Sequence, residues 1–209
     1  MKKGIFISLE GPDGSGKSTQ IRYIVEYLES RGYETVLTRE PGGTSIGEKI
    51  RDVILDRENS EMDPMTETML YAASRAQHVA QVIRPALEHG KVVICDRFVD
   101  SSIAYQGFGR DLGDCVAYIN EYAIMGCVPD ITFLMKLPPE EGIGRIGSGE
   151  KDRLESVKIS FHQKVYEGYE YLEKTYPGRI RGIDASGSIE EIRAEIEKQL
   201  EKLIEDNES

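Results

Sequence analysis

The 209-residue sequence is poor in cysteine and in positive charge, and it contains no long apolar run. No apolar stretch approaches the roughly 18 residues that a membrane helix needs, which argues against a membrane protein. The three cysteines are an odd number without C-x-x-C spacing, so neither a disulfide framework nor a zinc site is indicated, and a cytoplasmic location is expected. The formal net charge of −11 argues against nonspecific binding to nucleic acid or to an anionic membrane, but it leaves room for a small anionic ligand in a locally basic pocket.

Short apolar runs alternate with stretches of helical periodicity along the chain. The predicted strands are residues 4–10, 35–38, 92–95, 131–137 and 180–184. The predicted helices are residues 17–31, 46–55, 65–89 (with a kink or an end at Pro85) and a closing amphipathic helix that follows a capping box of Ser188 and Glu191. Strands that alternate with helices are typical of a three-layer α/β fold with a parallel sheet, and we expect one domain over residues 1–209.

Residues 11–18, Gly-Pro-Asp-Gly-Ser-Gly-Lys-Ser, match the phosphate-binding pattern G-x-x-x-x-G-K-[ST], with a predicted strand before them and a predicted helix after them. In this motif, backbone N–H groups and the positive end of the helix converge on phosphate oxygens. Lys17 should reach the β- and γ-phosphates of ATP, and the hydroxyl of Ser18 should bind Mg²⁺. The predicted ATP-binding residues are Gly11, Asp13, Gly14, Ser15, Gly16, Lys17, Ser18 and Thr19.

This loop predicts nucleotide binding but no particular reaction, because GTPases, ATP-driven motors and small kinases share it. The sequence has no N-K-x-D guanine motif, which argues against a GTPase. Asp96 follows the third predicted strand and precedes Arg97, whereas a motor usually has a second carboxylate at that position. An arginine beside the reaction centre favours an acceptor that itself carries phosphate.

Four arginines lie at predicted strand ends, at a glycine turn or on the long helix: Arg39, Arg75, Arg97 and Arg110. In open α/β sheets, ligands bind at the carboxyl edge of the strands. The planar guanidinium group suits phosphate because it can donate two parallel hydrogen bonds. We therefore expect a second anion site beside the phosphate loop.

Three further segments carry a family resemblance: residues 39–44 (Arg-Glu-Pro-Gly-Gly-Thr), residues 96–98 (Asp-Arg-Phe) with two serines at 101 and 102, and residues 104–107 (Ala-Tyr-Gln-Gly). Together with the phosphate loop they resemble thymidylate kinases, the P-loop kinases that make dTDP from dTMP with Mg-ATP. The resemblance runs from about residue 5 to residue 171. It implies a P-loop NTPase fold with a five-stranded parallel sheet flanked by helices, a short mobile lid at about residues 142–156, and a homodimer.

The resemblance also implies a set of dTMP-binding residues: Asp13, Arg39, Glu40, Pro41, Tyr71, Arg75, Arg97, Ser101, Ser102, Tyr105 and Gln106. Within this set, Arg97 and Arg39 would hold the phosphate of dTMP. Asp13 would orient the acceptor or its metal shell. That role agrees with the residue's place in the sequence, because a carboxylate inside a phosphate cradle needs a cation or a hydroxyl as partner.

The other implied contacts concern the nucleoside. Tyr71 would stack on thymine, and Arg75 would contact a carbonyl group of the base. Ser102 and Gln106 would hydrogen-bond the edge of the base. Tyr105 would lie under the deoxyribose and leave no room for a 2′-hydroxyl.

Phosphoryl transfer needs positive charge around the transferred group. No general base is expected, because a phosphate acceptor with a second pKa of about 6 is already mostly ionised at neutral pH. Some family members place an arginine in the phosphate loop, where this chain has Gly14, and others place it in the lid. The expected catalytic residues are Lys17, Arg97, Asp13, Arg153 and Arg145, with Arg153 favoured over Arg145 for contact with the γ-phosphate.

Two other functions stay open at this point. A kinase for another nucleoside monophosphate or for a nucleoside would share the loop, but a nucleoside acceptor would have less need of both Arg39 and Arg97. A P-loop ATPase or switch without an acceptor would hydrolyse ATP slowly and would not respond to any monophosphate.

Overall fold

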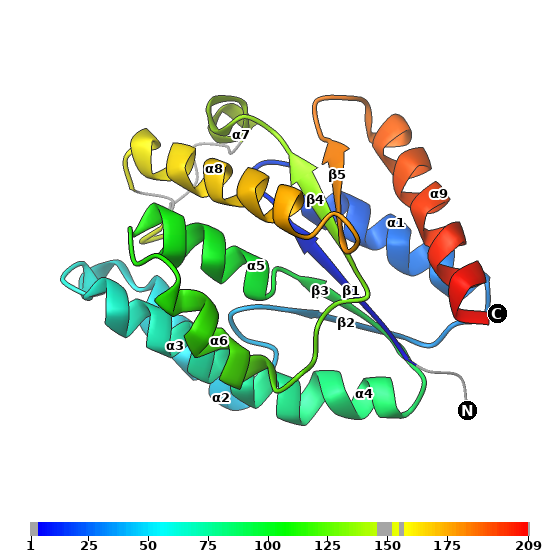
Figure 1. Cartoon of the computed structure of the whole chain (residues 1–209), viewed down its shortest axis with the longest axis horizontal. Coiled ribbons are helices and arrows are strands. Elements are labelled where there is room, and N and C mark those ends of the chain that lie inside the picture. Colours follow the sequence, from blue (N-terminus) through cyan, green and yellow to red (C-terminus); the bar gives the residue numbers. More distant parts are fainter. Residues whose placement is uncertain (1–3, 146–151, 155–156, 209) are drawn as a thin grey trace.

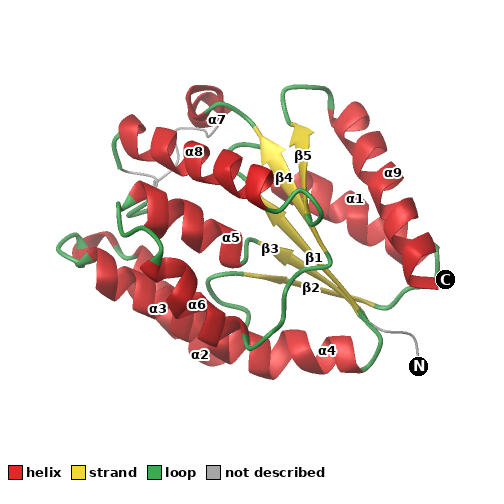
Figure 2. Ribbon diagram, viewed as in Figure 1, coloured by secondary structure: helices red, strands yellow, loops and turns green. Residues whose placement is uncertain are grey.

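A computed structural model describes residues 4–145, 152–154 and 157–208. At its centre is a parallel sheet of five strands in the order β2-β3-β1-β4-β5, with helices on both faces (Figures 1 and 2). The strands are β1 (Ile5–Glu10), β2 (Thr35–Arg39), β3 (Val92–Asp96), β4 (Ile131–Lys136) and β5 (Ile180–Asp184). The predicted strands and the three-layer α/β architecture are therefore confirmed.

The helices divide between the two faces of the sheet. The α-helices are α1 (Lys17–Ser30), α2 (Ser45–Leu55), α3 (Pro64–His78), α4 (Arg84–Glu88), α5 (Val99–Ser102), α6 (Cys115–Ile124), α7 (Pro139–Arg145), α8 (Ile159–Thr175) and α9 (Ile189–Glu208). Two π-helical segments, Val79–Ile83 and Ile103–Gly109, and a short 3-10 helix, Arg57–Asn59, complete the described elements. Helices α1 and α9 lie together on one face, while α3, α4, α5 and α8 lie on the other (Figure 1).

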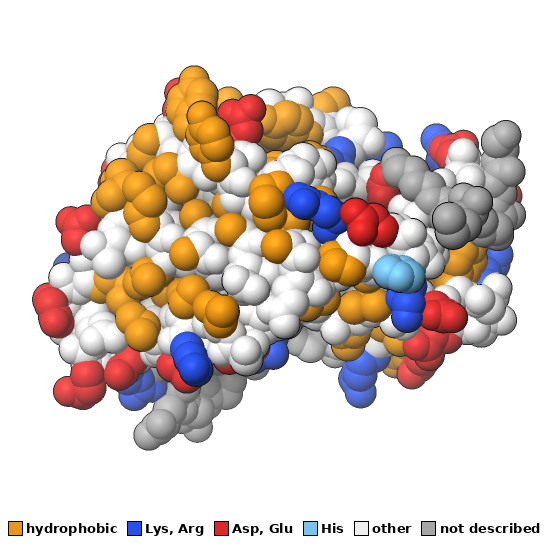
Figure 3. All heavy atoms as spheres, turned by 90° about the horizontal axis from the view of Figure 1, so that it is seen from below, with side chains coloured by type: hydrophobic (Ala, Val, Ile, Leu, Met, Phe, Trp, Pro, Cys, Tyr) orange, Lys and Arg blue, Asp and Glu red, His pale blue; other side chains and the backbone are white. Residues whose placement is uncertain are grey.

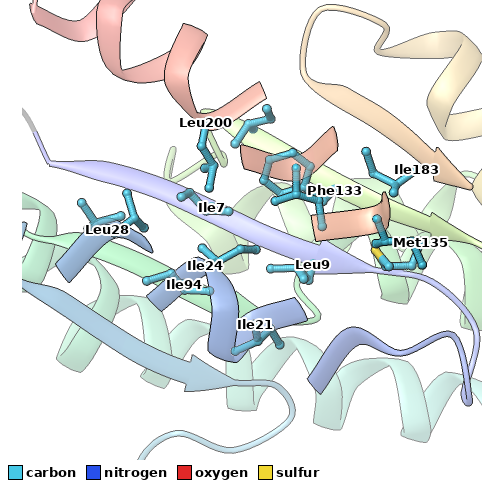
Figure 4. Close-up of a cluster of buried hydrophobic side chains, with 14 of the residues drawn as sticks. Ile7, Leu9, Ile21, Ile24, Leu28, Ile94, Phe133, Met135, Ile183 and Leu200 are labelled. Atoms are coloured by element: carbon cyan, nitrogen blue, oxygen red, sulfur yellow. The ribbon is translucent and has the colours of Figure 1, made fainter. Parts of the chain in front are cut away.

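The two faces of β1 explain why this strand is mostly apolar. Successive side chains of a strand point to opposite faces, so Ile7 and Leu9 pack with Ile24 of α1 and Leu200 of α9 (Figure 4). Phe6 points to the opposite face, into the cluster under α4. A strand buried on both faces needs apolar residues at almost every position, as is usual in parallel sheets.

The strand order places the loops that matter for function at one edge. β1 lies between β3 and β4, and β2 lies beyond β3. Because all five strands are parallel, the loops that follow β1, β2 and β3 leave the sheet at the same carboxyl edge. The crevice at this edge is where open α/β sheets bind ligands.

One predicted helix differs from the structure. The sequence predicts a helix over residues 65–89 with a kink or an end at Pro85, but the chain instead forms α3, a π-helical segment and α4 in succession. Pro85 is the second residue of α4 and has no N–H to donate back into the preceding turn. The wide π turn just before it accommodates the proline without ending the helical path.

The predicted lid over residues 142–156 is only partly described. Gly142–Arg145 form the end of α7, and residues 152–154 lie against the rest of the protein. Residues 146–151 and 155–156 lie outside the described residues. In the parts of the chain that are described, no helix combines the length and the apolar character needed to span a membrane.

Candidate active site

The phosphate loop leaves β1 and ends at the first turn of α1. Its three glycines, Gly11, Gly14 and Gly16, have positive φ angles of 134°, 77° and 86°, which only glycine adopts without strain. A Cβ atom on Gly14 would lie 2.2 Å from the carbonyl oxygen of Gly142. The first residue of the predicted lid therefore packs directly on the phosphate loop, and the loop needs glycine there for room as well as for conformation.

Lys17 begins α1 and is folded back over the loop. Its Nζ donates hydrogen bonds to the carbonyl oxygens of Gly11 at 3.1 Å and Pro12 at 2.9 Å. Burial and the neighbouring charge of Arg97 lower the pKa of Lys17 to about 8. A bound phosphate would reverse this effect, because a nearby anion favours the charged ammonium.

A cavity, here called the phosphate-loop cavity, lies beside the loop, and the end of β3 forms part of its wall. Asp96, at the end of that strand, lines the phosphate-loop cavity together with Lys17, Ser18 and Thr19. The Asp96 Oδ1 atom is buried and has no hydrogen-bond partner among the described residues. A buried carboxylate oxygen without a partner is costly unless a ligand satisfies it. A hydroxyl and a carboxylate are the oxygen donors that Mg²⁺ prefers, so these residues fit a magnesium ion.

Arg97 connects the phosphate loop to a second cavity. It adopts a left-handed φ of 66°, which directs its guanidinium group back over the loop. Nη2 donates to Asp13 Oδ1 at 2.5 Å, and Nη1 donates to the carbonyl oxygen of Gly11 at 2.9 Å and to the phenol oxygen of Tyr169 at 3.1 Å. Burial disfavours the ionised form of Asp13, but Arg97 and Lys17 outweigh it and lower the pKa of Asp13 to about 2.

The second cavity, here called the aromatic cavity, lies between the loops after β1 to β3 and the helices α2, α3 and α5. It is lined by Asp13, Glu40, Pro41, Arg51, Leu55, Tyr71, Arg75, Arg97, Phe98, Ser101, Ser102, Tyr105, Gln106, Asp152 and Leu154. Every residue that was predicted to bind dTMP lines this cavity, with the single exception of Arg39. The structure thus brings together residues from segments that are far apart in the sequence.

Arg75 is fixed in the wall of the aromatic cavity. Its side chain is 1% exposed and donates to Glu40 Oε2 at 2.8 Å, to Ser102 Oγ at 3.0 Å and to Asn120 Oδ1. The carbonyl oxygen of Phe98, in the loop after β3, accepts a further hydrogen bond from Arg75 Nη2 at 3.1 Å. A guanidinium group held by this many partners has a single orientation before any ligand arrives.

Two arginines, Arg39 and Arg51, line the cavity beside the phosphate loop. Arg39 lines the phosphate-loop cavity, is half exposed, and pairs with Glu48 of α2 at 2.8 Å. Arg51 was not predicted, yet it lines both cavities and donates to the carbonyl oxygen of Pro41 at 2.9 Å. The helical repeat offers a signal for it, because Arg51 is one turn after Gly47, which packs against the loop at Gly42.

Comparison with known proteins identifies the family. The sequence model described as thymidylate kinase matches residues 9–196. The chain belongs to the thymidylate kinase family. It is 54% identical to the thymidylate kinase of Exiguobacterium sp. over 195 residues (92% of each chain) and 50% identical to that of Clostridium novyi over 200 residues (94% of this chain and 98% of the relative). The crystal structure of thymidylate kinase from Ehrlichia chaffeensis matches with a TM-score of 0.77 and 33% identity, covering 95% of this chain and 99% of that one.

These findings confirm the resemblance to thymidylate kinases that the sequence shows, and they confirm the predicted P-loop NTPase fold. They also confirm the expected dTMP kinase over the alternative of a P-loop switch without an acceptor. The individual site residues stay predictions, because the comparisons match whole chains and do not assign roles to residues.

The two lid arginines of this thymidylate kinase family member lie in different places. Arg145, at the end of α7, lines the phosphate-loop cavity and donates to the carbonyl oxygen of Ala185 at 3.0 Å. Arg153 is 8% exposed and pairs with Glu67 of α3 at 2.6 Å, behind the aromatic cavity. The sequence favours Arg153 for the γ-phosphate, but this geometry places Arg145 beside the phosphate loop and Arg153 in an ion pair away from it.

Proposed function

We propose that this chain transfers the γ-phosphate of ATP to the phosphate of dTMP through the two cavities described above, and that it needs Mg²⁺ to do so. Membership of the thymidylate kinase family supports the substrate and the donor. The observation that carries the assignment of the site is the position of Arg97, whose guanidinium group lines both cavities at once. A cation shared by a donor site and an acceptor site can neutralise charge on both phosphates.

On the donor side, the N–H groups of the phosphate loop and Lys17 would hold the β- and γ-phosphates. Ser18 and Asp96 would hold Mg²⁺, which when bound supplies positive charge to the phosphate oxygens. Arg145 would add a further cation at the γ-phosphate, since it lines the same cavity.

On the acceptor side, Arg97 and Arg51 would hold the phosphate of dTMP, with Arg39 at the mouth of the phosphate-loop cavity. An ionised phosphate oxygen of dTMP attacks the γ-phosphorus, the bond from that phosphorus to the β–γ bridging oxygen breaks, and ADP leaves. Asp13 would not act as a base, because its pKa of about 2 leaves it ionised and held by Arg97.

The nucleoside of dTMP would occupy the aromatic cavity. Tyr71 would stack on the base, while Ser102 and Gln106 would bind its edge. Arg75 is held by Glu40 and Ser102 so that it faces the cavity as well. Tyr105, whose phenol oxygen lies 3.3 Å from Asp13 Oδ2, would lie below the sugar.

The test of this function is ADP release from Mg-ATP, with dTMP, dUMP, dCMP, AMP or no acceptor in parallel, and with Lys17→Ala as the blank. We expect a strong signal with dTMP, a weaker one with dUMP, and little with the others. Equal signals in every well, with or without acceptor, would contradict the proposal and would indicate an ATPase. A repeat with EDTA in place of Mg²⁺ should abolish the signal.

We also propose that the chain is a homodimer of single-domain subunits in the cytoplasm, with the lid at residues 142–156. Figure 3 shows hydrophobic side chains gathered on the face seen from below. The contacting helices α3 and α6 carry three exposed hydrophobic side chains: Tyr122 is 84% exposed, Tyr118 67% and Met69 51%. Apolar side chains grouped in this way favour a protein partner. Sedimentation analysis should give a dimer, and Tyr122→Glu should shift it towards monomer. The three cysteines are free, which suits a reducing compartment.

A further inference from the structure

Glu67 is a fully buried carboxylate that the proposed mechanism does not use. It lies in the first turn of α3, one turn before Tyr71, and its side chain is 0% exposed. Its Oε1 atom accepts hydrogen bonds from Gln106 Nε2 at 2.9 Å and from Arg110 Nε at 3.3 Å. Its Oε2 atom accepts bonds from Arg110 Nη2 at 3.0 Å and from Arg153 Nη2 at 2.6 Å.

These contacts keep Glu67 ionised. Burial alone would favour the neutral acid, but the hydrogen bonds from Arg110 and Gln106 outweigh it and lower the pKa of Glu67 below its ordinary value. An ionised carboxylate has no proton to donate and can only accept hydrogen bonds. Glu67 therefore dictates which end of the Gln106 amide turns towards it, and that end is the NH₂ group.

The other end of the amide has no hydrogen-bond partner among the described residues. Gln106 is 1% exposed, and its Oε1 atom is buried. The residue lines the aromatic cavity beside Ser102 and Arg75. A buried carbonyl oxygen without a partner, on a residue that lines the cavity, is expected of a group preformed to accept a hydrogen bond from a ligand.

We infer that Glu67 is a positioning residue that sets the polarity of the Gln106 amide and thereby selects the base. Thymine and uracil carry a proton on N3, which can be donated to the Gln106 carbonyl oxygen. Cytosine carries a lone pair on N3, which that oxygen repels. This inference rests on the proposed dTMP site, since it concerns the base within the same cavity.

The substitution Glu67→Gln tests the polarity directly. Guanidinium groups can only donate, and two of them reach Oε2 at 3.0 and 2.6 Å, whereas only Arg110 Nε reaches Oε1, at 3.3 Å. The carbonyl oxygen of a glutamine at position 67 should therefore take the place of Oε2. Its NH₂ group then faces Gln106, which must turn its own carbonyl oxygen towards it and present NH₂ to the base. The cavity would then favour an acceptor at N3 in place of a donor.

The experiment measures kcat and KM for dTMP and for dCMP with the wild type and with Glu67→Gln. We expect kcat/KM for dTMP to fall about tenfold to a hundredfold, mostly through KM, and kcat/KM for dCMP to stay level or rise. Glu58→Gln removes one exposed carboxylate outside both cavities and should change neither ratio. An equal loss for both substrates would overturn the inference, because it would mean that Glu67 only supports the structure.

Two further variants keep the test decisive. Gln106→Ala should lose the preference for dTMP by itself, and adding Glu67→Gln to it should change the dTMP to dCMP ratio no further. If Glu67→Gln does not fold, Glu67→Asp serves instead: it keeps an acceptor-only group and must keep the preference for dTMP, even at a lower rate. A wild type that ignores dTMP would refute the proposed function, whereas a selective wild type with an equally selective Glu67→Gln would refute this inference alone.

Discussion

The two cavities of the site differ in how completely the protein satisfies its own charges. Around the aromatic cavity, Arg75 is held by Glu40, and Glu67 is held by Arg153 and Arg110. In the phosphate-loop cavity, by contrast, Lys17 bonds only to carbonyl oxygens of its own loop, and Asp96 Oδ1 has no partner among the described residues.

In the proposed mechanism, this difference separates recognition of the base from transfer of the phosphate. Groups that already have partners cannot rearrange cheaply, so the aromatic cavity can discriminate between bases with little adjustment on binding. The phosphate-loop cavity lacks part of its charge balance until a nucleotide and a metal enter. Substitutions on the two sides should therefore change different kinetic constants.

The largest effect should come from Arg145, one of the two arginines of the predicted lid. Arg145→Ala should lower turnover by about 10³-fold with little change in dTMP affinity, because it removes a cation beside the transferred phosphate. Arg153→Ala should instead raise KM for dTMP with a small change in turnover, because Arg153 supports Glu67 behind the base.

Steady-state kinetics with saturating ATP separate these outcomes. Arg57→Ala, which alters an exposed arginine outside both cavities, is the matched control. A turnover loss in Arg153→Ala together with none in Arg145→Ala would show that Arg153 leaves its ion pair during the reaction. The proposed division, in which Arg145 acts in phosphate transfer and Arg153 supports base recognition, would then be wrong.

A smaller effect should distinguish Arg51 from Arg39. Arg51 lines both cavities, so Arg51→Ala should raise KM for dTMP by about tenfold to a hundredfold. Arg39 is half exposed and pairs with Glu48 at the surface, so Arg39→Ala should raise it only a few-fold. Steady-state kinetics at saturating ATP measures KM for dTMP in both variants. The reverse ranking would restore Arg39 as the main phosphate ligand.

The smallest effect should concern stability and not rate. Glu10 ends β1 beneath both cavities and accepts bonds from the N–H of Phe98 at 2.7 Å and from the hydroxyls of Ser101 and Tyr169. Burial, reinforced by the negative charge of Asp100, raises the pKa of Glu10 from 4.5 to about 7. The folded state therefore binds a proton more tightly than the unfolded state does.

The contribution of Glu10 to stability is fully present below pH 4.5 and is lost as the pH rises to about 7. Glu10→Gln cannot ionise, so its free energy of unfolding relative to the wild type should rise by at least about 1 kcal/mol between pH 5 and pH 8. Urea unfolding at several pH values measures this. A constant difference between the two proteins across that range would show that Glu10 keeps one ionisation state.

Much of the architecture could be predicted because it depends on local patterns. The apolar run of β1, the glycines of the phosphate loop and the capping box of Ser188 and Glu191 are all legible in a few consecutive residues, and the structure contains each of them. The family, too, could be identified from motifs that keep their order along the chain, and the comparisons confirm it.

The remainder depends on contacts between distant segments. Arg51 resembles any arginine of a surface helix until α2 is placed against the loop at Pro41. Glu67 resembles an ordinary acidic residue in a first helical turn, because its partners come from residues 106, 110 and 153. The position of Arg153 could not be predicted either, because the residues around it do not indicate an ion pair with Glu67 of α3.

The strand order has a consequence for how the protein is made. β1 and its phosphate loop are synthesised first, but Arg97 meets Asp13 across 84 residues of chain, and β4 reaches β1 only after residue 131. Translation at roughly 5–20 residues per second leaves the loop without either neighbour for several seconds. A nascent chain that stops before β4 can pair β1 with β3, but β1 still lacks its neighbour on the other side, so ATP binding should arise late in synthesis.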